Sequence, residues 1–291
     1  MKQFQPGWKG TLKATALTAA IAVNVMASAP GNASAQLDAA ATKKNVSYAT
    51  QVIDLSQVFG NKTEVTGKFG WSNVSILNES GKKIARVRYP AGSYDPGSMK
   101  KRGKPAGGTG FRMKLALPSN CMHLDYQVRF APGFPFVKGG KLPGLGGGKG
   151  NSGGNIPDGS DGFSTRFMWR SNGEGEVYAY LPTSKTWGTS LGRGNWHMAP
   201  GAWNRLEQTV RLNTPGKSDG EISVRLNGLP VHDTRGLRFR DTDRLTIDLL
   251  IFETFFGGNS PDWATPVDTY TDFSDMNVST CNGTDEMGVS K

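Results

Sequence analysis

Two neighbouring β-strands are predicted by the stretch GFSTRFMWR at residues 162–170 and the stretch VYAY at residues 177–180. In a strand, side chains two residues apart point to the same face of the sheet. Ser164 and Arg166 therefore share a face, and so do the two tyrosines of the second stretch. The alternate positions are mostly apolar, which predicts one face packed into a core and one polar face turned to solvent or to a ligand.

The same alternation of apolar and polar residues continues through most of the chain after residue 50. Apolar stretches are short and broken by turn residues, and no segment keeps a 3.6-residue periodicity, which favours strands over long helices. We expect an all-β fold, a two-sheet β-jelly roll of the concanavalin-like sandwich type, with a concave groove for an extended ligand. The expected strands are Ala85–Tyr89, Phe111–Leu117, Leu124–Phe130, Phe163–Arg170, Glu176–Leu181, Trp203–Leu212, Glu221–Leu226, Leu245–Phe255 and Thr271–Val278.

Two glycine-rich segments interrupt this pattern. Residues 139–162 contain eleven glycines but do not form a phosphate-binding loop, because no Gly-Lys-Ser/Thr follows at the required spacing and no helix is predicted after it. We expect a long loop here, either a flexible connection or a lid, since loops of this length in compact domains are usually functional. The other segment, residues 92–110, is basic and carries Lys100, Lys101, Arg102 and Lys104.

The first 35 residues have the features of a secretory signal peptide. A start with three lysines is followed by an apolar run at residues 17–26 and by a small-residue cleavage pattern just before Gln36. We therefore expect Gln36 to begin the mature chain and the protein to be secreted or periplasmic. Residues 36–50 are predicted to be a polar lead-in segment, and residues 51–291 a single β-sandwich domain without a membrane span.

The chain is basic, with a formal net charge of +10 that falls to +7 without the predicted signal peptide. A positive charge on an exported protein favours a polyanionic partner: an acidic polysaccharide, a nucleic acid or a membrane surface. It equally suits a protein that gains only solubility from its charge, so the charge alone does not choose between these classes.

Cysteine and histidine are rare, which limits metal chemistry. The two cysteines, Cys121 and Cys281, are expected to pair as one disulfide in an exported chain. They are too few for a zinc site, and the three histidines show no metal-ligand spacing. We therefore expect no metal site and no cofactor.

Taken together, these motifs resemble the alginate lyase group of polysaccharide lyase family 14. The resemblance rests on GGKLPGL at residues 139–145, on GFSxRxMWR at residues 162–170 and on the Tyr-x-Tyr pair that follows. FFGG at residues 255–258, with the later Trp-Ala and Thr-Asp-Phe, is similar to the C-terminal end of that family. The combined pattern is specific, covers roughly residues 84–278, and implies a β-jelly roll similar to that of glucuronan lyases. The glycine-rich loop after Lys141 is longer than the family pattern, which bears on substrate preference.

The resemblance implies functional residues. The family's essential lysine matches Lys141, its serine and arginine match Ser164 and Arg166, and its two tyrosines match Tyr178 and Tyr180. It also implies a reaction, the β-elimination of the 4-O-glycosidic bond of a polyuronate. Such a reaction requires a neutralised C6 carboxylate, a base for the C5 proton and an acid for the leaving O4.

Each predicted catalytic residue suits one of these tasks. A guanidinium grips a carboxylate with two parallel hydrogen bonds, so Arg166, with Lys141, suits the first. Nearby cations favour a phenolate, so Tyr178 and Tyr180 suit the proton transfers, with a slight preference for Tyr180. Lys141 is the second candidate for the base, if neighbouring cations depress its pKa.

Three further residues are predicted to contact the substrate. Ser164 lies one strand step from Arg166 and offers a hydroxyl. Arg170 offers a further guanidinium for a carboxylate along the groove. His197 titrates near neutrality and is a weaker acid–base candidate, so it is assigned to substrate binding.

The leading hypothesis is a secreted, monomeric lyase that cleaves alginate, with mannuronate-rich regions as the expected substrate. A glucuronan lyase is the closest rival, because both polymers carry one carboxylate per sugar. A non-catalytic carbohydrate-binding module on the same fold remains open, although it has no need of the full set of five residues. A glycoside hydrolase requires two facing carboxylates that no motif supplies, and a nucleic-acid binder lacks a recognised motif.

Overall fold

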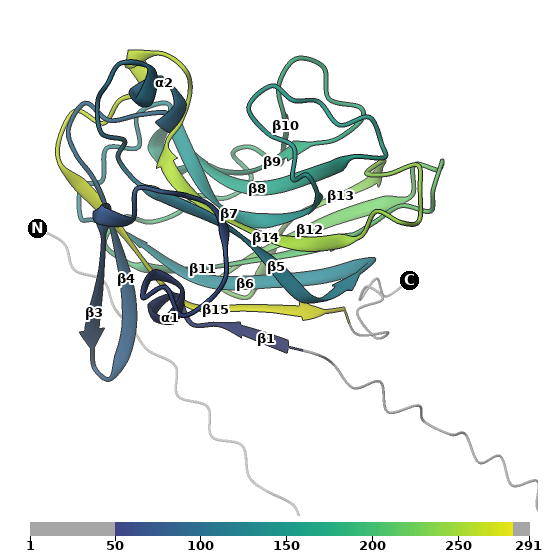
Figure 1. The fold of residues 1–291 in the computed structure, drawn as a ribbon, viewed down its shortest axis with the longest axis horizontal. Helices are drawn as coiled ribbons and strands as arrows, with labels where there is room; N and C mark the ends of the chain where they lie inside the picture. Colours follow the sequence, from purple (N-terminus) through teal and green to yellow (C-terminus); the bar gives the residue numbers. More distant parts are fainter. Residues whose placement is uncertain (1–49, 282–291) are drawn as a thin grey trace, which may run out of the picture. The chain divides into compact units, whose positions relative to one another are not determined.

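Fifteen strands, two short helices and three 3₁₀ turns make up the part of the chain that the computed structural model describes, residues 50–281. The strands form two antiparallel sheets that pack face to face (Figure 1). The back sheet consists of β1 (Thr50–Ile53), β3 (Val74–Glu79), β4 (Lys82–Tyr89), β6 (Cys121–Phe130), β11 (Trp203–Arg211), β12 (Gly220–Leu226), β13 (Leu229–Leu237) and β15 (Thr269–Thr280).

The front sheet carries the candidate site described below. Its strands are β2 (Thr66–Phe69), β5 (Thr109–Ser119), β7 (Gly139–Gly148), β8 (Gly162–Arg170), β9 (Gly175–Tyr180), β10 (Thr189–Leu191) and β14 (Ile247–Phe256). The helices are α1 (Leu55–Phe59) and α2 (Pro96–Lys101), and the 3₁₀ turns are Trp71–Asn73, Ser171–Gly173 and Pro261–Trp263.

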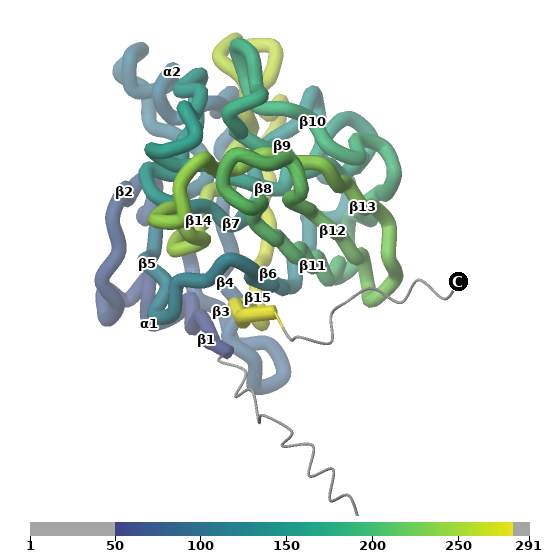
Figure 2. Tube along the Cα trace, turned by 90° about the vertical axis from the view of Figure 1, so that its right-hand side faces the viewer, coloured from purple at the N-terminus to yellow at the C-terminus, as the bar shows by residue number. Residues whose placement is uncertain are grey.

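The order of strands is typical of a jelly roll. The front sheet runs β10-β9-β8-β7-β14-β5-β2, and the back sheet runs β13-β12-β11-β6-β15-β4-β3, with β1 added to β15. Figure 2 shows β8 and β9 lying above β6 and β11. The predicted all-β sandwich is therefore confirmed. Each of the nine predicted strands is present with its ends shifted by a few residues, whereas β1, β2, β3, β7, β10 and β13 were not predicted.

The core lies between the two sheets and follows from the period-two alternation. On β6, for example, Leu124, Tyr126 and Val128 are fully buried while the residues between them are partly exposed. Aromatic rings fill much of this layer: Phe111 stacks on Phe252 with ring centroids 4.9 Å apart. Burial of such large apolar side chains is the main driving force for closing the two sheets.

The prediction of a loop over residues 139–162 was wrong for the first half of that segment. Residues 139–148 form β7, a central strand of the front sheet between β8 and β14. Its glycines are needed because neighbouring groups approach closely. A Cβ atom on Gly140 would lie 2.0 Å from the ring of Trp169, and one on Gly144 would lie 2.3 Å from the carbonyl oxygen of Thr165. Glycine here permits close packing rather than flexibility.

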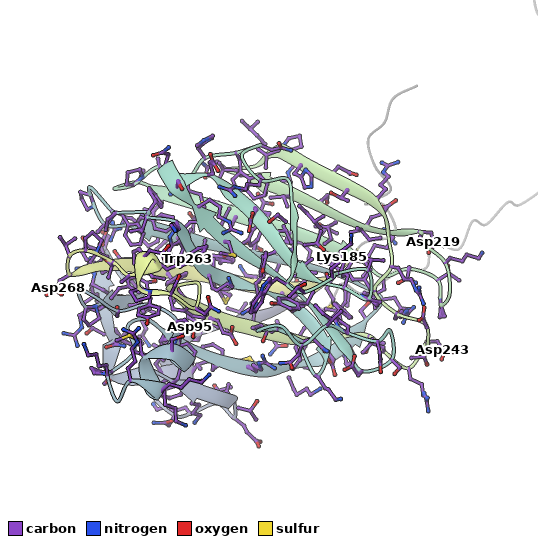
Figure 3. The ribbon with its side chains drawn as sticks, turned by 90° about the horizontal axis from the view of Figure 1, so that it is seen from above. Asp95, Lys185, Asp219, Asp243, Trp263 and Asp268 are labelled. Atoms are coloured by element: carbon purple, nitrogen blue, oxygen red, sulfur yellow. A yellow bond between two sulfur atoms is a disulfide. The ribbon has the colours of Figure 1, made fainter. Side chains whose placement is uncertain are left out.

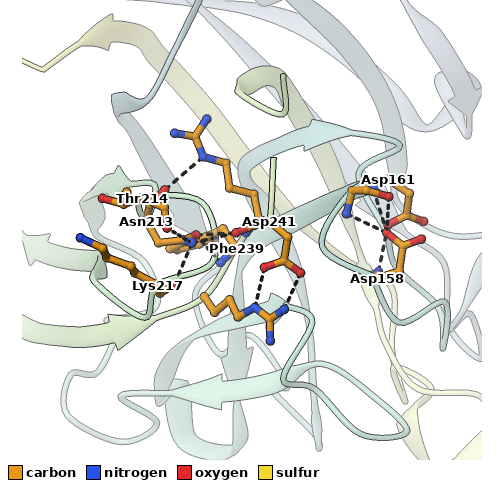
Figure 4. A network of polar contacts seen from close by, with 10 residues as sticks. Asp158, Asp161, Asn213, Thr214, Lys217, Phe239 and Asp241 are labelled. Atoms are coloured by element: carbon orange, nitrogen blue, oxygen red, sulfur yellow. Dashed lines mark hydrogen bonds and ion pairs between the residues drawn. The ribbon is translucent and has the colours of Figure 1, made fainter. Parts of the chain in front are cut away.

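The second half of the segment, residues 149–161, lies over the outer face of the front sheet and is held down by hydrogen bonds. The hydroxyl of Ser164 donates to the carbonyl oxygen of Asn151 at 2.6 Å. At its far end, the backbone N–H of Asp241 donates to the carbonyl oxygen of Gly159 at 2.7 Å. Figure 4 shows this end, where Asp158 and Asp161 lie near Asp241. The covering loop is therefore anchored at two places.

Asn213 is the centre of the polar network that supports this anchor (Figure 4). Its side-chain amide donates to the carbonyl oxygens of Thr214, Lys217 and Arg240 at 2.8–2.9 Å. Its side-chain oxygen accepts the backbone N–H groups of Phe239 and Arg240. Buried polar groups that are fully paired in this way fix the path of the connecting chain.

The ends of the described chain lie on the back sheet. A disulfide joins Cys121, at the start of β6, to Cys281, just after β15. The predicted signal peptide (residues 1–35) and residues 36–49 of the lead-in segment lie outside the described residues, so the domain boundaries stay predictions. No helix among the described residues is long and apolar enough to cross a membrane.

Candidate active site

A cavity of about 550 Å³ opens on the outer face of the front sheet. It is lined by Lys141 from β7, Arg166 and Arg170 from β8, and Tyr178 and Tyr180 from β9. The structure therefore brings the four predicted catalytic residues and one predicted substrate contact to a single cavity. In Figure 1, α2 rises at one side of this face and the loops around β10 rise at the other.

Strand register explains why these side chains meet. Arg166 on β8 lies opposite Tyr178 on β9 and opposite Gly144 on β7. Because Gly144 has no side chain, the guanidinium does not compete for space with a side chain from β7. The register shifts between Lys141 and Gly144, where β7 holds one residue more than β8. This bulge turns Leu142 into the core and Lys141 outward, as bulges near active sites commonly re-aim a side chain.

Lys141 lies in an unusual environment for a lysine. Its amine is 3.0 Å from the sulfur of Met168 and 4.5 Å from the centroid of the Tyr178 ring. Burial, and then the positive charges of Arg166 and Arg170, hold the pKa of Lys141 well below its usual value. At a given pH, a larger fraction of Lys141 is therefore in the neutral form, which can accept a proton, than for a lysine in water.

The two tyrosines differ from the sequence-based expectation. Burial, and then the neighbouring Tyr180, raise the pKa of Tyr178 to about 12. The expectation that cations lower the pKa was wrong for Tyr178, because loss of solvent disfavours the phenolate more than Arg170 favours it. Tyr180 is buried, and its hydroxyl accepts the backbone N–H of Gly154 at 3.0 Å. The two rings meet edge to face, with centroids 5.7 Å apart.

Both arginines are paired with carboxylates that were not predicted as site residues. Arg166 is 3% exposed and forms an ion pair with Glu253 of β14. Arg170 pairs with the fully buried Glu176 of β9, at 2.7 Å. Glu176 stands two residues before Tyr178, so same-face spacing along β9 was the signal that identifies it. No comparable signal marks Glu253, which joins the site only through the pairing of β14 with β7.

The charges of this set nearly cancel. Lys141, Arg166 and Arg170 face Glu176 and Glu253, so a protonated lysine leaves one excess positive charge and a neutral lysine leaves none. An anionic ligand would therefore bind best to the protonated form and, on binding, would favour the proton on Lys141. Among the described residues, no cluster of histidine, cysteine, aspartate or glutamate is placed to hold a metal ion.

Two predicted substrate contacts do not reach the cavity. Ser164 is fully buried beneath the covering loop, and its hydroxyl is used by the carbonyl oxygen of Asn151. It therefore positions the loop. His197 is exposed on the segment after β10, where its backbone bridges Glu174 rather than facing the cavity. In place of these two residues, the cavity is walled by Trp187 and Trp263.

The tryptophans stand on loops at the rim of the cavity. Trp187 follows β9 and is 52% exposed, and Trp263 ends the 3₁₀ turn after β14. In Figure 3, Lys185 from the first of these loops lies across the face from Trp263 and Asp95. Indole rings at the rim of a polar cavity, one exposed and one partly buried, suit the apolar faces of sugar rings, while the cations between them suit carboxylates.

Comparison with known proteins identifies the family. The model of the family described as Polysaccharide lyase 14 matches residues 77–276. The chain belongs to polysaccharide lyase family 14. The resemblance predicted from the motifs is thereby confirmed, and the protein is a polysaccharide lyase. No curated protein matches the chain.

Solved structures of alginate lyases have the same fold. The PL-14 alginate lyase from Aplysia kurodai is 31% identical, covering 78% of this chain and 95% of its own, with a TM-score of 0.67. Alginate lyase vAL-1 from Chlorella virus is 23% identical over 79% of this chain and 99% of its own, also with a TM-score of 0.67. A variant of alginate lyase Aly36B in complex with alginate tetrasaccharide is 25% identical, covering 81% of this chain and 94% of its own, with a TM-score of 0.62.

Proposed function

We propose that this polysaccharide lyase cleaves alginate, with mannuronate-rich regions as its main substrate, by β-elimination outside the cell. The observation that carries the proposal is the meeting of Lys141, Arg166 and Tyr178 in one cavity, with a low pKa at the amine and a high pKa at the phenol. Two groups whose environments push their pKa values apart supply a base and an acid at the same pH. The alginate lyases among the similar solved structures support this choice of substrate.

The roles follow from these protonation states. Neutral Lys141 takes the C5 proton, and the electrons of that C–H bond form the C4–C5 double bond. The C4–O4 bond breaks, and its oxygen takes the phenolic proton of Tyr178. Transfer of the proton from the lysine ammonium to the phenolate then resets the pair, whose amine and ring centroid lie 4.5 Å apart. This assignment replaces Tyr180 as the preferred proton carrier, since the Tyr180 hydroxyl holds the covering loop.

The arginines serve the developing charge. We place the C6 carboxylate at Arg166 and Arg170, whose ion pairs with Glu253 and Glu176 fix the guanidinium groups before the substrate arrives. Preorganised donors aimed at developing charge typically contribute about 3–4 kcal/mol to transition-state stabilisation. Because each guanidinium keeps further N–H groups, the ion pairs leave donors for the substrate.

The test uses the mature protein with polymannuronate, polyguluronate and glucuronan in parallel, followed by the ultraviolet absorbance of unsaturated uronate ends. We expect the fastest rise with polymannuronate. A faster rise with glucuronan would move the assignment to a glucuronan lyase, and a faster rise with polyguluronate would overturn the mannuronate preference. Products without the double bond would overturn β-elimination.

Export is tested separately. The predicted signal peptide implies that the protein recovered from the medium or the periplasm begins at Gln36. N-terminal sequencing of the recovered chain checks this, and an intact Met1 would overturn the assignment.

A further inference from the structure

A second hollow, of about 450 Å³, lies under α2 and the turn that follows it. Its lining combines two kinds of group. Phe69, Pro96 and Ala106 supply apolar surface, and Lys100 and Lys104 supply positive charge. This combination matches a uronate residue, which presents an apolar ring face and one carboxylate.

The hollow continues from the active-site cavity. Asp95 lines the cavity, and the next residue, Pro96, lines the hollow. On the other side, the Phe69 ring meets the Phe255 ring of the cavity wall edge to face, with centroids 6.1 Å apart. The two depressions therefore share a wall, on the side of the face where Figure 3 shows Asp95 and Trp263.

The cations of this region lack the partners that neighbouring lysines have. Near the cavity, Lys138 pairs with Asp262 and Lys149 pairs with Asp161. Lys100 and Lys104 are exposed, and within residues 50–281 neither forms an ion pair with a carboxylate. The carboxylate of Asp95, at the start of α2, accepts the backbone N–H of Ser98 at 2.7 Å. Charge left unpaired over an apolar floor favours an anionic ligand over a purely solvated surface.

We propose that this hollow is a further subsite, which binds a uronate residue of the polymer beyond the sugars that the active-site cavity holds. The proposal rests on the proposed function of the cavity. The sugar ring lies on Phe69 and Pro96, and its carboxylate lies between Lys100 and Lys104. Long chains reach this subsite and short ones do not, so it makes affinity depend on chain length and on salt.

The test compares Lys100→Ala/Lys104→Ala with the matched control Lys62→Ala/Lys217→Ala, which removes the same charge from exposed positions that line neither hollow. Affinity for trimannuronate and for long polymannuronate is measured by calorimetric titration at low and high salt, in a Lys141→Ala background that prevents turnover. Because exposed ion pairs are each worth little, we expect the first pair of changes to weaken binding of the long polymer roughly threefold to tenfold at low salt. Trimannuronate affinity is expected to be unchanged.

Three outcomes would overturn the subsite: equal losses in the test and control variants, equal losses for trimer and polymer, or no loss. Failure of the proposed function is detected in a different measurement: the wild-type protein would then yield no unsaturated uronate ends from any polyuronate. A length-dependent loss of affinity in a protein without such activity would keep the subsite and overturn the cleavage. Thermal unfolding of both double variants checks that the hollow stays folded.

Discussion

The outer faces of the two sheets carry similar charged residues in opposite states. On the back sheet, Asp272 is fully buried and accepts hydrogen bonds from Arg86 at 2.7 and 3.0 Å and from Arg129 at 2.8 and 3.0 Å. Arg129 also pairs with Glu79, and this contact raises the pKa of Arg129. Each charge in this cluster of two arginines and two carboxylates is stabilised by an opposite charge, so the cluster has no net charge.

On the front sheet, loops cover the charges and leave one cation beside a sulfur and an aromatic ring. Lys141 contacts Met168 and Tyr178, and its pKa falls, whereas the pKa of Tyr178 rises. The comparison teaches that residue type does not make the reactive face. The covering loops do, because they remove water and separate the protonation behaviour of neighbouring groups.

Removing the amine should have the largest effect. Lys141→Ala is expected to lower kcat by about 10²–10⁴-fold, the usual contribution of a positioned proton-transfer group, while polymer binding persists. Initial rates from ultraviolet absorbance check this. The matched control is Lys82→Ala, which removes a lysine ion-paired on the back sheet. Comparable losses of kcat in both variants would contradict a specific role of the front-sheet lysine in the reaction.

The next largest effect should be a difference between the two tyrosines in the loss of kcat on substitution. Tyr178→Phe removes the proposed acid and is expected to lower kcat by about 10²-fold or more. Tyr180→Phe removes the acceptor for the Gly154 N–H and should act more weakly, through a looser covering loop. Steady-state kinetics of both variants on one polymer measure the ratio. A larger loss for Tyr180→Phe would return the proton transfer to Tyr180.

A change on the back sheet should affect stability without affecting catalysis. Asp272→Asn removes the charge that two arginines share, and a charged hydrogen bond is worth about 1.5–3 kcal/mol of unfolding free energy. We expect a loss near the lower value, because the side chains of Arg86 and Arg129 stay 30% and 20% exposed to water. Chemical denaturation measures the stability, and kcat measured below the unfolding transition should match the wild type. A large fall in kcat would show that this face also serves the reaction.

The smallest expected effect is on the pH profile. The rate should rise with pH as Lys141 loses its proton, and that limb should lie well below the usual lysine range. The carboxylate of Glu253 raises the pKa of Lys141, so Glu253→Gln should move the rising limb to lower pH. Profiles of kcat/KM for both proteins measure the shift. A shift to higher pH would show that Lys141 is not the group that titrates.

Much of the fold was predictable because period-two alternation reports burial directly. The alternation failed on β7, where glycines at 140 and 144 allow backbone and aromatic groups to approach closely and leave no side chains to reveal a pattern. Edge strands such as β2 and β10 are short and weakly patterned, so they were missed too.

The site was predictable only as far as residue type and same-face spacing reach. Lys141, Arg166 and the Tyr-x-Tyr pair follow from the motifs. The ion pair between Arg166 and Glu253 joins positions far apart in the sequence and depends on a register that no local pattern encodes. The burial of Ser164 and the raised pKa of Tyr178 depend on the covering loop, which alternation along a strand does not describe.

The place of β15 has a consequence for how the chain is made. Strands β7, β8, β9 and β10 are consecutive and each pairs with the next, so this half of the front sheet consists of local hairpins, which are expected to form early in folding. In the back sheet, β6 and β4 are joined only through β15, the last strand of the described chain. The back sheet is therefore expected to close only after β15 has been synthesised, and the disulfide between Cys121 and Cys281 then links the start of β6 to the end of β15.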